Sequence, residues 1–147
     1  MKKLVGAAVL FTHCIALAAT VEARNDAYFL AIDGALQSTD PGESPYSSVK
    51  FFFAHQETPP IITRLGSETT HQRSRTNPSI DVKACNAAFL LALAALQKRA
   101  QRMGANAVVN ITSYYKNNKL ENASEFECHA GAAAHVMLRG EFVKIGD

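Results

Sequence analysis

The chain has 147 residues, of which 48% are hydrophobic, so it is long enough to form one domain with a substantial core. Its 15 lysines and arginines against 13 aspartates and glutamates give a formal net charge of +2 at pH 7. This near balance gives no electrostatic basis for binding to nucleic acid or to an anionic membrane surface.

The first 23 residues have the pattern of a secretory signal peptide. Two lysines follow Met1, residues 4–19 form an apolar run without a formal charge, and the small residue Ala23 precedes Arg24. We expect cleavage after Ala23, with an earlier candidate site after Ala18. The predicted mature region, 24–147, is then a single exported domain in the periplasm or the surrounding medium.

Two other interpretations of this segment are a membrane anchor and a lipid-modified cysteine. The apolar run is shorter than the ~20 residues that cross a hydrocarbon core, and Thr12 and His13 interrupt it. Cys14 follows His13, whereas a lipobox places a small residue before its cysteine. We therefore predict that Cys14 is removed with the signal and that no span remains.

The first half of the mature chain reads as strands separated by turn-rich segments. Residues 27–32 are apolar and partly aromatic and end at a turn over Asp33 and Gly34, so they predict a strand. Residues 39–45 are dense in turn residues and predict a loop. A second strand is expected over 48–54. Its core-facing candidates are Val49, Phe51 and Phe53.

A break at Pro59 and Pro60 precedes a third predicted strand over 61–65. The polar residues 66–78 that follow it are expected to form a loop or a frayed hairpin.

One strong helix is predicted over 80–103, with Ser79 as its N-cap and Gly104 as the residue that ends it. Between residues 84 and 96 the sequence is apolar almost all round, and alanines alternate with leucines and a phenylalanine. Such a helix should be buried close against a sheet, because alanine permits a close approach. Asn86 and the short apolar length argue against a membrane span.

Three strands follow the helix. Residues 105–115 alternate so that Ala107, Val109 and Ile111 share one face and Val108, Asn110 and Thr112 the other. Strands over 124–130 and 134–145 predict a hairpin about Gly131. Strands, one long helix and then strands predict an α+β fold, with one antiparallel or mixed sheet and the helix packed on one face.

The mature region keeps two cysteines, Cys85 and Cys128. Cysteines of a small exported domain usually pair, and only one pairing is open to them. A disulfide would join the start of the helix to the 124–130 strand, with Phe126, Cys128 and Ala130 facing the helix and Glu127 and His129 facing away. It should add roughly 4 kcal/mol on the chain-entropy model. No C-x-x-C spacing supports thiol–disulfide exchange chemistry.

The segment from Ala95 to Val109 resembles the helix-to-strand junction of small bacterial heavy-metal-binding-like domains of the YbjQ type, and the junction in the Rcs outer-membrane stress-sensor lipoprotein. The whole mature chain is similar to a group of small exported bacterial proteins of unassigned activity that often carry an excinuclease-subunit name. The matching segments are 84–110, 113–116 and 125–131. These resemblances imply an α+β fold and, for the YbjQ type, metal binding.

No sequence pattern indicates an enzyme. The chain lacks the G-x-x-x-x-G-K-[ST] loop of an ATPase, and a Cys85–His129 nucleophilic pair would lose its thiol to the disulfide. Arg73 and Arg75 with His71 form a small basic cluster without the interleaved aromatic residues of a nucleic-acid site. We therefore expect no catalytic residues, no cofactor and no nucleic-acid partner.

Metal binding is the specific alternative. His55, His71, Cys128, His129 and His135 are the available ligand types. His129 and His135 would lie roughly 20 Å apart on one continuous strand, and they can meet only if the chain folds back near Gly131. The sequence thus predicts a non-enzymatic binding domain of the bacterial envelope. It would contact a protein or small ligand through an exposed sheet face or the 66–78 loop, with a metal-binding protein using His129 and His135 as the alternative.

Overall fold

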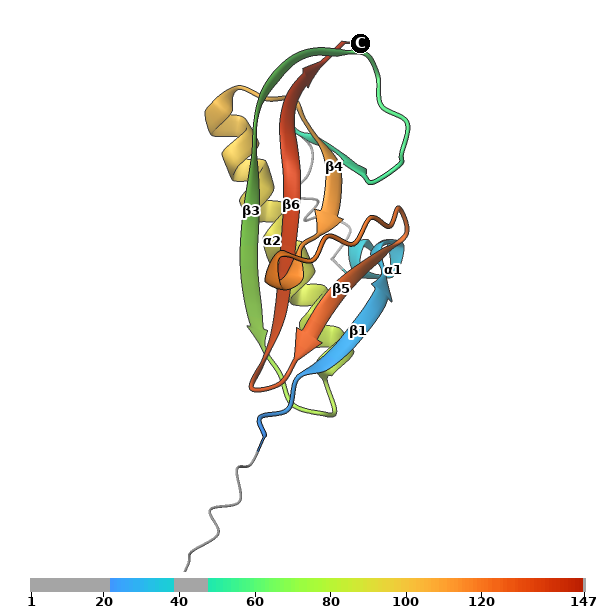
Figure 1. The fold of residues 1–147 in the computed structure, drawn as a ribbon, viewed down its shortest axis with the longest axis vertical. Helices are drawn as coiled ribbons and strands as arrows, with labels where there is room; N and C mark the ends of the chain where they lie inside the picture. Colours follow the sequence, from blue (N-terminus) through green and yellow to red (C-terminus); the bar gives the residue numbers. More distant parts are fainter. Residues whose placement is uncertain (1–21, 39–47, 147) are drawn as a thin grey trace, which may run out of the picture.

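The computed structural model describes residues 22–38 and 48–146 (Figure 1). Residues 1–21 of the predicted signal peptide and the predicted loop at 39–45 lie outside the described residues. The elements in chain order are β1 (Asp26–Ala31), α1 (Ile32–Leu36), β2 (Lys50–Phe53), β3 (Ile61–Arg75), α2 (Asp81–Met103), β4 (Ala107–Ser113), a 3₁₀ turn η1 (Tyr115–Asn117), β5 (Glu125–Ala130) and β6 (Ala133–Ile145). No helix among the described residues is long and apolar enough to cross a membrane.

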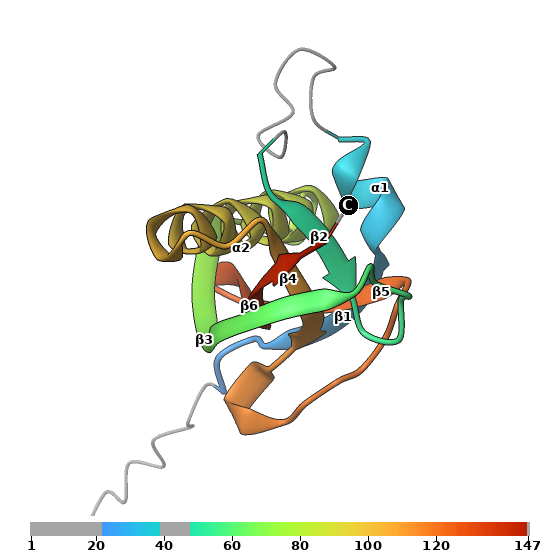
Figure 2. The same cartoon turned by 90° about the horizontal axis from the view of Figure 1, so that it is seen from above.

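The six strands form one mixed sheet centred on β6. The order is β1-β5-β6-β4-β2, and β3 pairs with β6 on the other side. β6 runs antiparallel to β3 along its whole length, while its opposite edge pairs first with β5 and then with β4. β2 is parallel to β4. The sheet curls so that α2 lies against one face (Figure 2), which confirms the predicted α+β class.

The core fills the space between α2 and the sheet. Phe89, Leu93 and Leu96 of α2 are fully buried, and the Phe89 ring stacks on Phe126 of β5 with ring centroids 4.2 Å apart. On β2, Phe53 is also buried in this core. The alanines of the helix allow this close packing, as the sequence predicts.

The predicted bounds of α2 are confirmed at its end and corrected at its start. Gly104 closes the helix in the left-handed conformation, with φ of 72°. The helix begins at Asp81, after Ile80, and no side chain caps it. Ser79 is therefore not the cap. Its hydroxyl and its amide both donate to the side chain of Asn77, in a turn that precedes the helix.

The predicted disulfide is present, with Cys85 bonded to Cys128. Cys85 lies in the first turns of α2 and Cys128 lies on β5, and both residues are completely buried. Phe126, Cys128 and Ala130 face the helix core, so the predicted orientation of this strand is confirmed.

Two segments differ from the sequence prediction because long-range contacts decide them. Residues 66–75 are strand and not loop, since β3 continues to Arg75 in unbroken register with β6. A polar strand at the edge of a sheet shows little apolar alternation. After β1, the chain forms the short helix α1 and not a tight turn at Asp33 and Gly34. Ile32 and Ala35, three residues apart, are buried on one side of that helix.

β4 also differs from a regular strand. Val108 and Ile111 both face the helix core, whereas Ala107 and Val109 belong to a second cluster on the opposite face. The expectation that Ile111 shares a face with Val109 is therefore wrong. The pairing of β4 with β6 shifts between Val109 and Thr112, and Asn110 has φ of 50°. A β-bulge at Asn110 adds one residue and so reverses the alternation.

Candidate functional site

The sheet face that points away from α2, called here the outer face, carries three histidines. Ala134 and Val136 of β6 are buried against the helix, so the intervening His135 lies on the outer face. His129 of β5 pairs directly with His135 across the hairpin. His71 comes from the part of β3 that the sequence predicts as loop. The three residues therefore come from three adjacent strands.

His71 and His135 form the closest pair. The Nε2 atom of His71 lies 2.9 Å from the Nδ1 atom of His135, and the ring centroids are 5.2 Å apart. His71 is exposed and His135 is half-buried. The two nitrogens share one proton in a hydrogen bond, so at least one of them has a lone pair directed at the other.

The surroundings of His135 favour the neutral form of its imidazole. Burial lowers the pKa of the His135 imidazole below its usual value of 6.5, and electrostatic repulsion involving Arg73 and the other two histidines lowers it further. Arg73 pairs with His135 across the β3–β6 ladder, which explains its effect. A neutral imidazole is the form that binds a metal ion.

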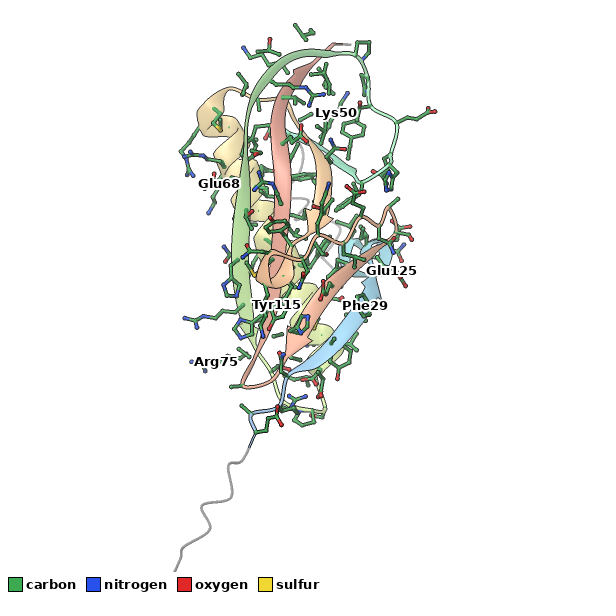
Figure 3. The ribbon with its side chains drawn as sticks, in the orientation of Figure 1. Phe29, Lys50, Glu68, Arg75, Tyr115 and Glu125 are labelled. Atoms are coloured by element: carbon green, nitrogen blue, oxygen red, sulfur yellow. A yellow bond between two sulfur atoms is a disulfide. The ribbon has the colours of Figure 1, made fainter. Side chains whose placement is uncertain are left out.

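His129 is held differently from the exposed pair. Its Nε2 atom lies 2.7 Å from a carboxylate oxygen of Glu127, and the Tyr115 ring stacks on the imidazole with centroids 3.5 Å apart. Tyr115 belongs to η1, which crosses the outer face in front of β5 and β6 (Figure 3). The Nδ1 atom of His129 is buried without a hydrogen-bond partner. The ring is therefore oriented by a carboxylate and covered by an aromatic side chain.

The structure brings only part of the predicted ligand set together. The chain folds back at Gly131, so His129 and His135 are cross-strand neighbours, as the metal hypothesis requires. Cys128 is in the disulfide, and His55 lies elsewhere, beside Glu121. Within residues 22–38 and 48–146, no three histidine, cysteine or acidic side chains converge in a way that could hold a metal ion. The partner of His135 is His71. The sequence did not predict this pair, because it placed His71 in a loop and not in a strand of the sheet.

The same geometry bears on the nucleophilic alternative. Cys85 is bonded to Cys128, and Cys128 faces the helix, whereas His129 faces the outer side of the sheet. The cysteine sulfurs and the imidazole of His129 are therefore on opposite faces of β5, and no thiolate–imidazole pair can form between them.

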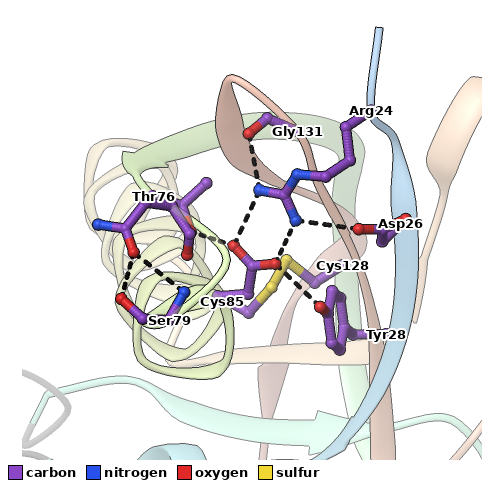
Figure 4. Close-up of polar contacts among 10 residues, drawn as sticks. Arg24, Asp26, Tyr28, Thr76, Ser79, Cys85, Cys128 and Gly131 are labelled. Atoms are coloured by element: carbon purple, nitrogen blue, oxygen red, sulfur yellow. Dashed lines mark hydrogen bonds and ion pairs between the residues drawn. A yellow bond between two sulfur atoms is a disulfide. The ribbon is translucent and has the colours of Figure 1, made fainter. Parts of the chain in front are cut away.

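A second polar cluster lies beside the disulfide, at the start of α2 (Figure 4). Asp81 is only 3% exposed, and its carboxylate accepts hydrogen bonds from Arg24, Tyr28 and Thr76. Arg24 also donates to the carboxylate of Asp26 and to the backbone carbonyl of Gly131, over 2.9 and 3.0 Å. This cluster joins the start of β1, the start of α2 and the β5–β6 turn.

Electrostatics in this cluster follow from those contacts. The Arg24 hydrogen bonds, followed by that from Thr76, hold the pKa of the Asp81 carboxyl well below its usual range. The same carboxylate raises the pKa of the Tyr28 phenol and of the Arg24 guanidinium. Every oxygen of the buried carboxylate is thus satisfied, which makes the cluster a structural junction.

Comparisons with protein families, with curated proteins and with solved structures find no match to this chain.

Proposed function

We propose that this protein is a non-enzymatic, exported binding domain of the bacterial envelope, and that its outer face binds a divalent late first-row transition metal at His71 and His135. The observation that carries the proposal is the 2.9 Å separation between the two imidazole nitrogens. The two surfaces that the sequence proposes for binding, a sheet face and the 66–78 segment, meet at this pair, because β3 is part of the sheet.

The separation of the nitrogens favours particular metals. Metal–nitrogen bonds to imidazole are about 2.0–2.1 Å long, so an ion bound to both nitrogens 2.9 Å apart would subtend an angle of about 90°. That angle suits the tetragonal geometry of Cu²⁺ or Ni²⁺ better than tetrahedral Zn²⁺, and Cu²⁺ also has the highest intrinsic affinity for nitrogen ligands. Binding would require a change of tautomer: the ring that donates the shared proton would move it, through solvent, to its other nitrogen, so that both rings stay neutral and both facing nitrogens offer a lone pair to the metal.

His129 is a neighbour of this site and not one of its two ligands. It lies across the hairpin from His135, and the carboxylate of Glu127 and the stacked Tyr115 ring hold its imidazole in place. The other coordination positions would be open to water or to a ligand, since only two side chains of the described residues converge here.

The test is a titration of the oxidised 24–147 chain with CuSO₄, NiCl₂ and ZnCl₂, in which calorimetry measures the heat of binding. Electron paramagnetic resonance then identifies the ligands in the copper form. We expect saturable binding, tightest for Cu²⁺, with nitrogen couplings from imidazole. Lowering the pH should weaken binding, because protons compete with the metal for the imidazole nitrogens.

Substitution identifies the ligands. His71→Ala and His135→Ala should each weaken copper binding at least tenfold. The single imidazole that remains in each variant cannot hold the ion through two nitrogens at once. His55→Ala removes an exposed histidine outside the site and should leave binding unchanged. Equal binding by all three variants, or no heat with any of the three metals, would exclude this function.

A further inference from the structure

The outer edge of β3 is the edge that faces away from β6. β3 is the outermost strand on the left of Figure 1, and its one strand partner among the described residues is β6. From Gly66 to Arg75 it stays in unbroken register with β6. No backbone hydrogen bond in the described parts of the chain joins this stretch to any segment besides β6. Its other edge therefore presents a regular row of free N–H and C=O groups.

A groove lies beside this edge, between β3 and the C-terminal half of α2. It has a volume of about 260 Å³, and Ala95, Leu96, Arg99 and Arg102 form its helix side. Its strand side runs from Glu68 to His71. A strand edge beside a helix is the arrangement that accepts an extended peptide as an additional strand, with backbone hydrogen bonds on one side and side-chain contacts on the helix.

The charges along this edge indicate which kind of peptide it would bind. Arg73 shares the outer face with His135, and Arg75 lies two residues further along, on the same face. Arg99 and Arg102 are exposed on the helix side. The one acid of the β3 stretch, Glu68, is paired with Arg99 at 2.8 Å, and Glu68 and Arg75 mark the two ends of the charged stretch in Figure 3. An added strand would thus have cations beside both rows of its side chains.

We infer that the outer edge of β3 binds an acidic, extended peptide segment of a partner protein by strand addition. A second copy of this chain is a poorer occupant than an acidic peptide, because its β3 would add Arg73 and Arg75 to the cations already present, while its one acid in this stretch, Glu68, is already paired with Arg99. Strand addition needs neither a metal nor His135, so this inference goes beyond the proposed metal function and can hold or fail without it.

The test measures binding of a fluorescein-labelled ten-residue peptide of alternating glutamate and valine to the oxidised 24–147 chain, in EDTA, by fluorescence anisotropy. We expect saturable binding that weakens as salt rises from 50 to 500 mM, because exposed charges are screened. A peptide of alternating lysine and valine should not bind. The same acidic peptide with N-methyl groups on alternate backbone nitrogens keeps its charge and loses strand pairing, so it should bind at least tenfold more weakly.

Variants locate the site on the protein. Arg73→Glu with Arg75→Glu should weaken binding of the acidic peptide at least tenfold. The matched control is Lys50→Glu with Lys83→Glu, which makes the same change in net charge at exposed lysines outside β3 and should leave affinity unchanged. Circular dichroism verifies that each variant is folded. Amide hydrogen exchange of residues 66–75 should slow when the peptide is bound, since the free edge gains partners.

Several results would overturn the inference. Equal affinity for the methylated and unmethylated peptides would mean charge attraction without strand addition. Tighter binding of single-stranded oligonucleotides than of the peptide would assign the cations to nucleic acid. A dimer in analytical ultracentrifugation that the acidic peptide does not dissociate would assign the edge to a second copy. His135→Ala should bind the peptide normally, which separates this outcome from the metal proposal.

Discussion

At the scale of single residues, the Asp81 cluster and the His71–His135 pair differ in their exposure to water. Asp81 is almost completely buried and has partners on both of its oxygens, whereas the imidazoles of His71 and His135 meet at an open face. A buried and fully bonded carboxylate fixes structure, because its hydrogen bonds are strengthened by exclusion of water. The facing nitrogens of His71 and His135 lie instead at a surface that a ligand can reach.

The Asp81 cluster predicts an acid-dependent loss of stability. The folded-state pKa of Asp81 is depressed, so its contribution is fully present above the unfolded-state value of about 3.9 and is lost as the pH falls below that value toward the folded pKa. Asp81→Asn should therefore lower the urea midpoint clearly at pH 7 and progressively less below pH 4. Urea unfolding across pH 2–7 measures both curves.

The control for this prediction is Asp26→Asn. Asp26 also contacts Arg24, but its side chain is about half exposed, so its removal should change the urea midpoint little at any pH. Parallel pH profiles for the wild type and Asp81→Asn would contradict the role assigned to the buried carboxylate.

At the scale of elements, the disulfide and the aromatic stack join α2 to β5 at one end of the sheet. Phe89 stacks on Phe126, and the Cys85–Cys128 bond lies in the same core. The bond closes a segment of 43 residues that includes the rest of α2 and all of β4. Its removal should therefore act on the folding of the whole domain, because the loop it closes contains most of the core.

We predict that Cys85→Ala with Cys128→Ala lowers the free energy of unfolding by about 2–5 kcal/mol. Urea unfolding followed by circular dichroism measures the change. The wild type under reducing conditions keeps both sulfur atoms, and it separates loss of the cross-link from loss of side-chain volume. If reduction and double substitution both leave the urea midpoint unchanged, the bond makes no net contribution to stability.

At the scale of the whole molecule, the start of the predicted mature chain is part of the fold. Arg24 is the first residue after the predicted cleavage site, and its guanidinium contacts Asp81, Asp26 and Gly131. These contacts connect the start of β1 to α2 and to the β5–β6 turn. Cleavage after Ala23 or at an earlier position keeps them, whereas cleavage beyond Arg24 removes them.

If export and cleavage occur as predicted, mass spectrometry of the processed protein should find a chain that begins at or before Arg24. A purified chain that begins at Asn25 should unfold at lower urea concentration than one that begins at Arg24, because Asp81 loses its main partner. A chain that begins at Glu22 keeps every contact and should match the Arg24 chain. A natural N-terminus at Asn25 or later would contradict this prediction.

Features that depend on local pattern or on simple counting could be predicted from the sequence. The long run of apolar residues and Gly104 identify α2 and its end, the two cysteines of the predicted mature region allow one pairing, and Gly131 separates two alternating segments. Each of these signals lies within a few residues of the element it specifies, or has only one solution. The face of Cys128 followed because alternation in β5 is regular.

Features that depend on partners distant in sequence became visible only in the folded chain. Residues 66–75 are polar and become a strand only because β6 pairs with them, which places His71 beside His135 and leaves the opposite edge of β3 open. The bulge at Asn110 changes which face Ile111 occupies, and the ion pair of Arg24 with Asp81 joins residues far apart in the chain. The physical reason is the same throughout. Strand pairing and buried charge pairs are satisfied by residues far away in sequence, and no local pattern specifies which ones.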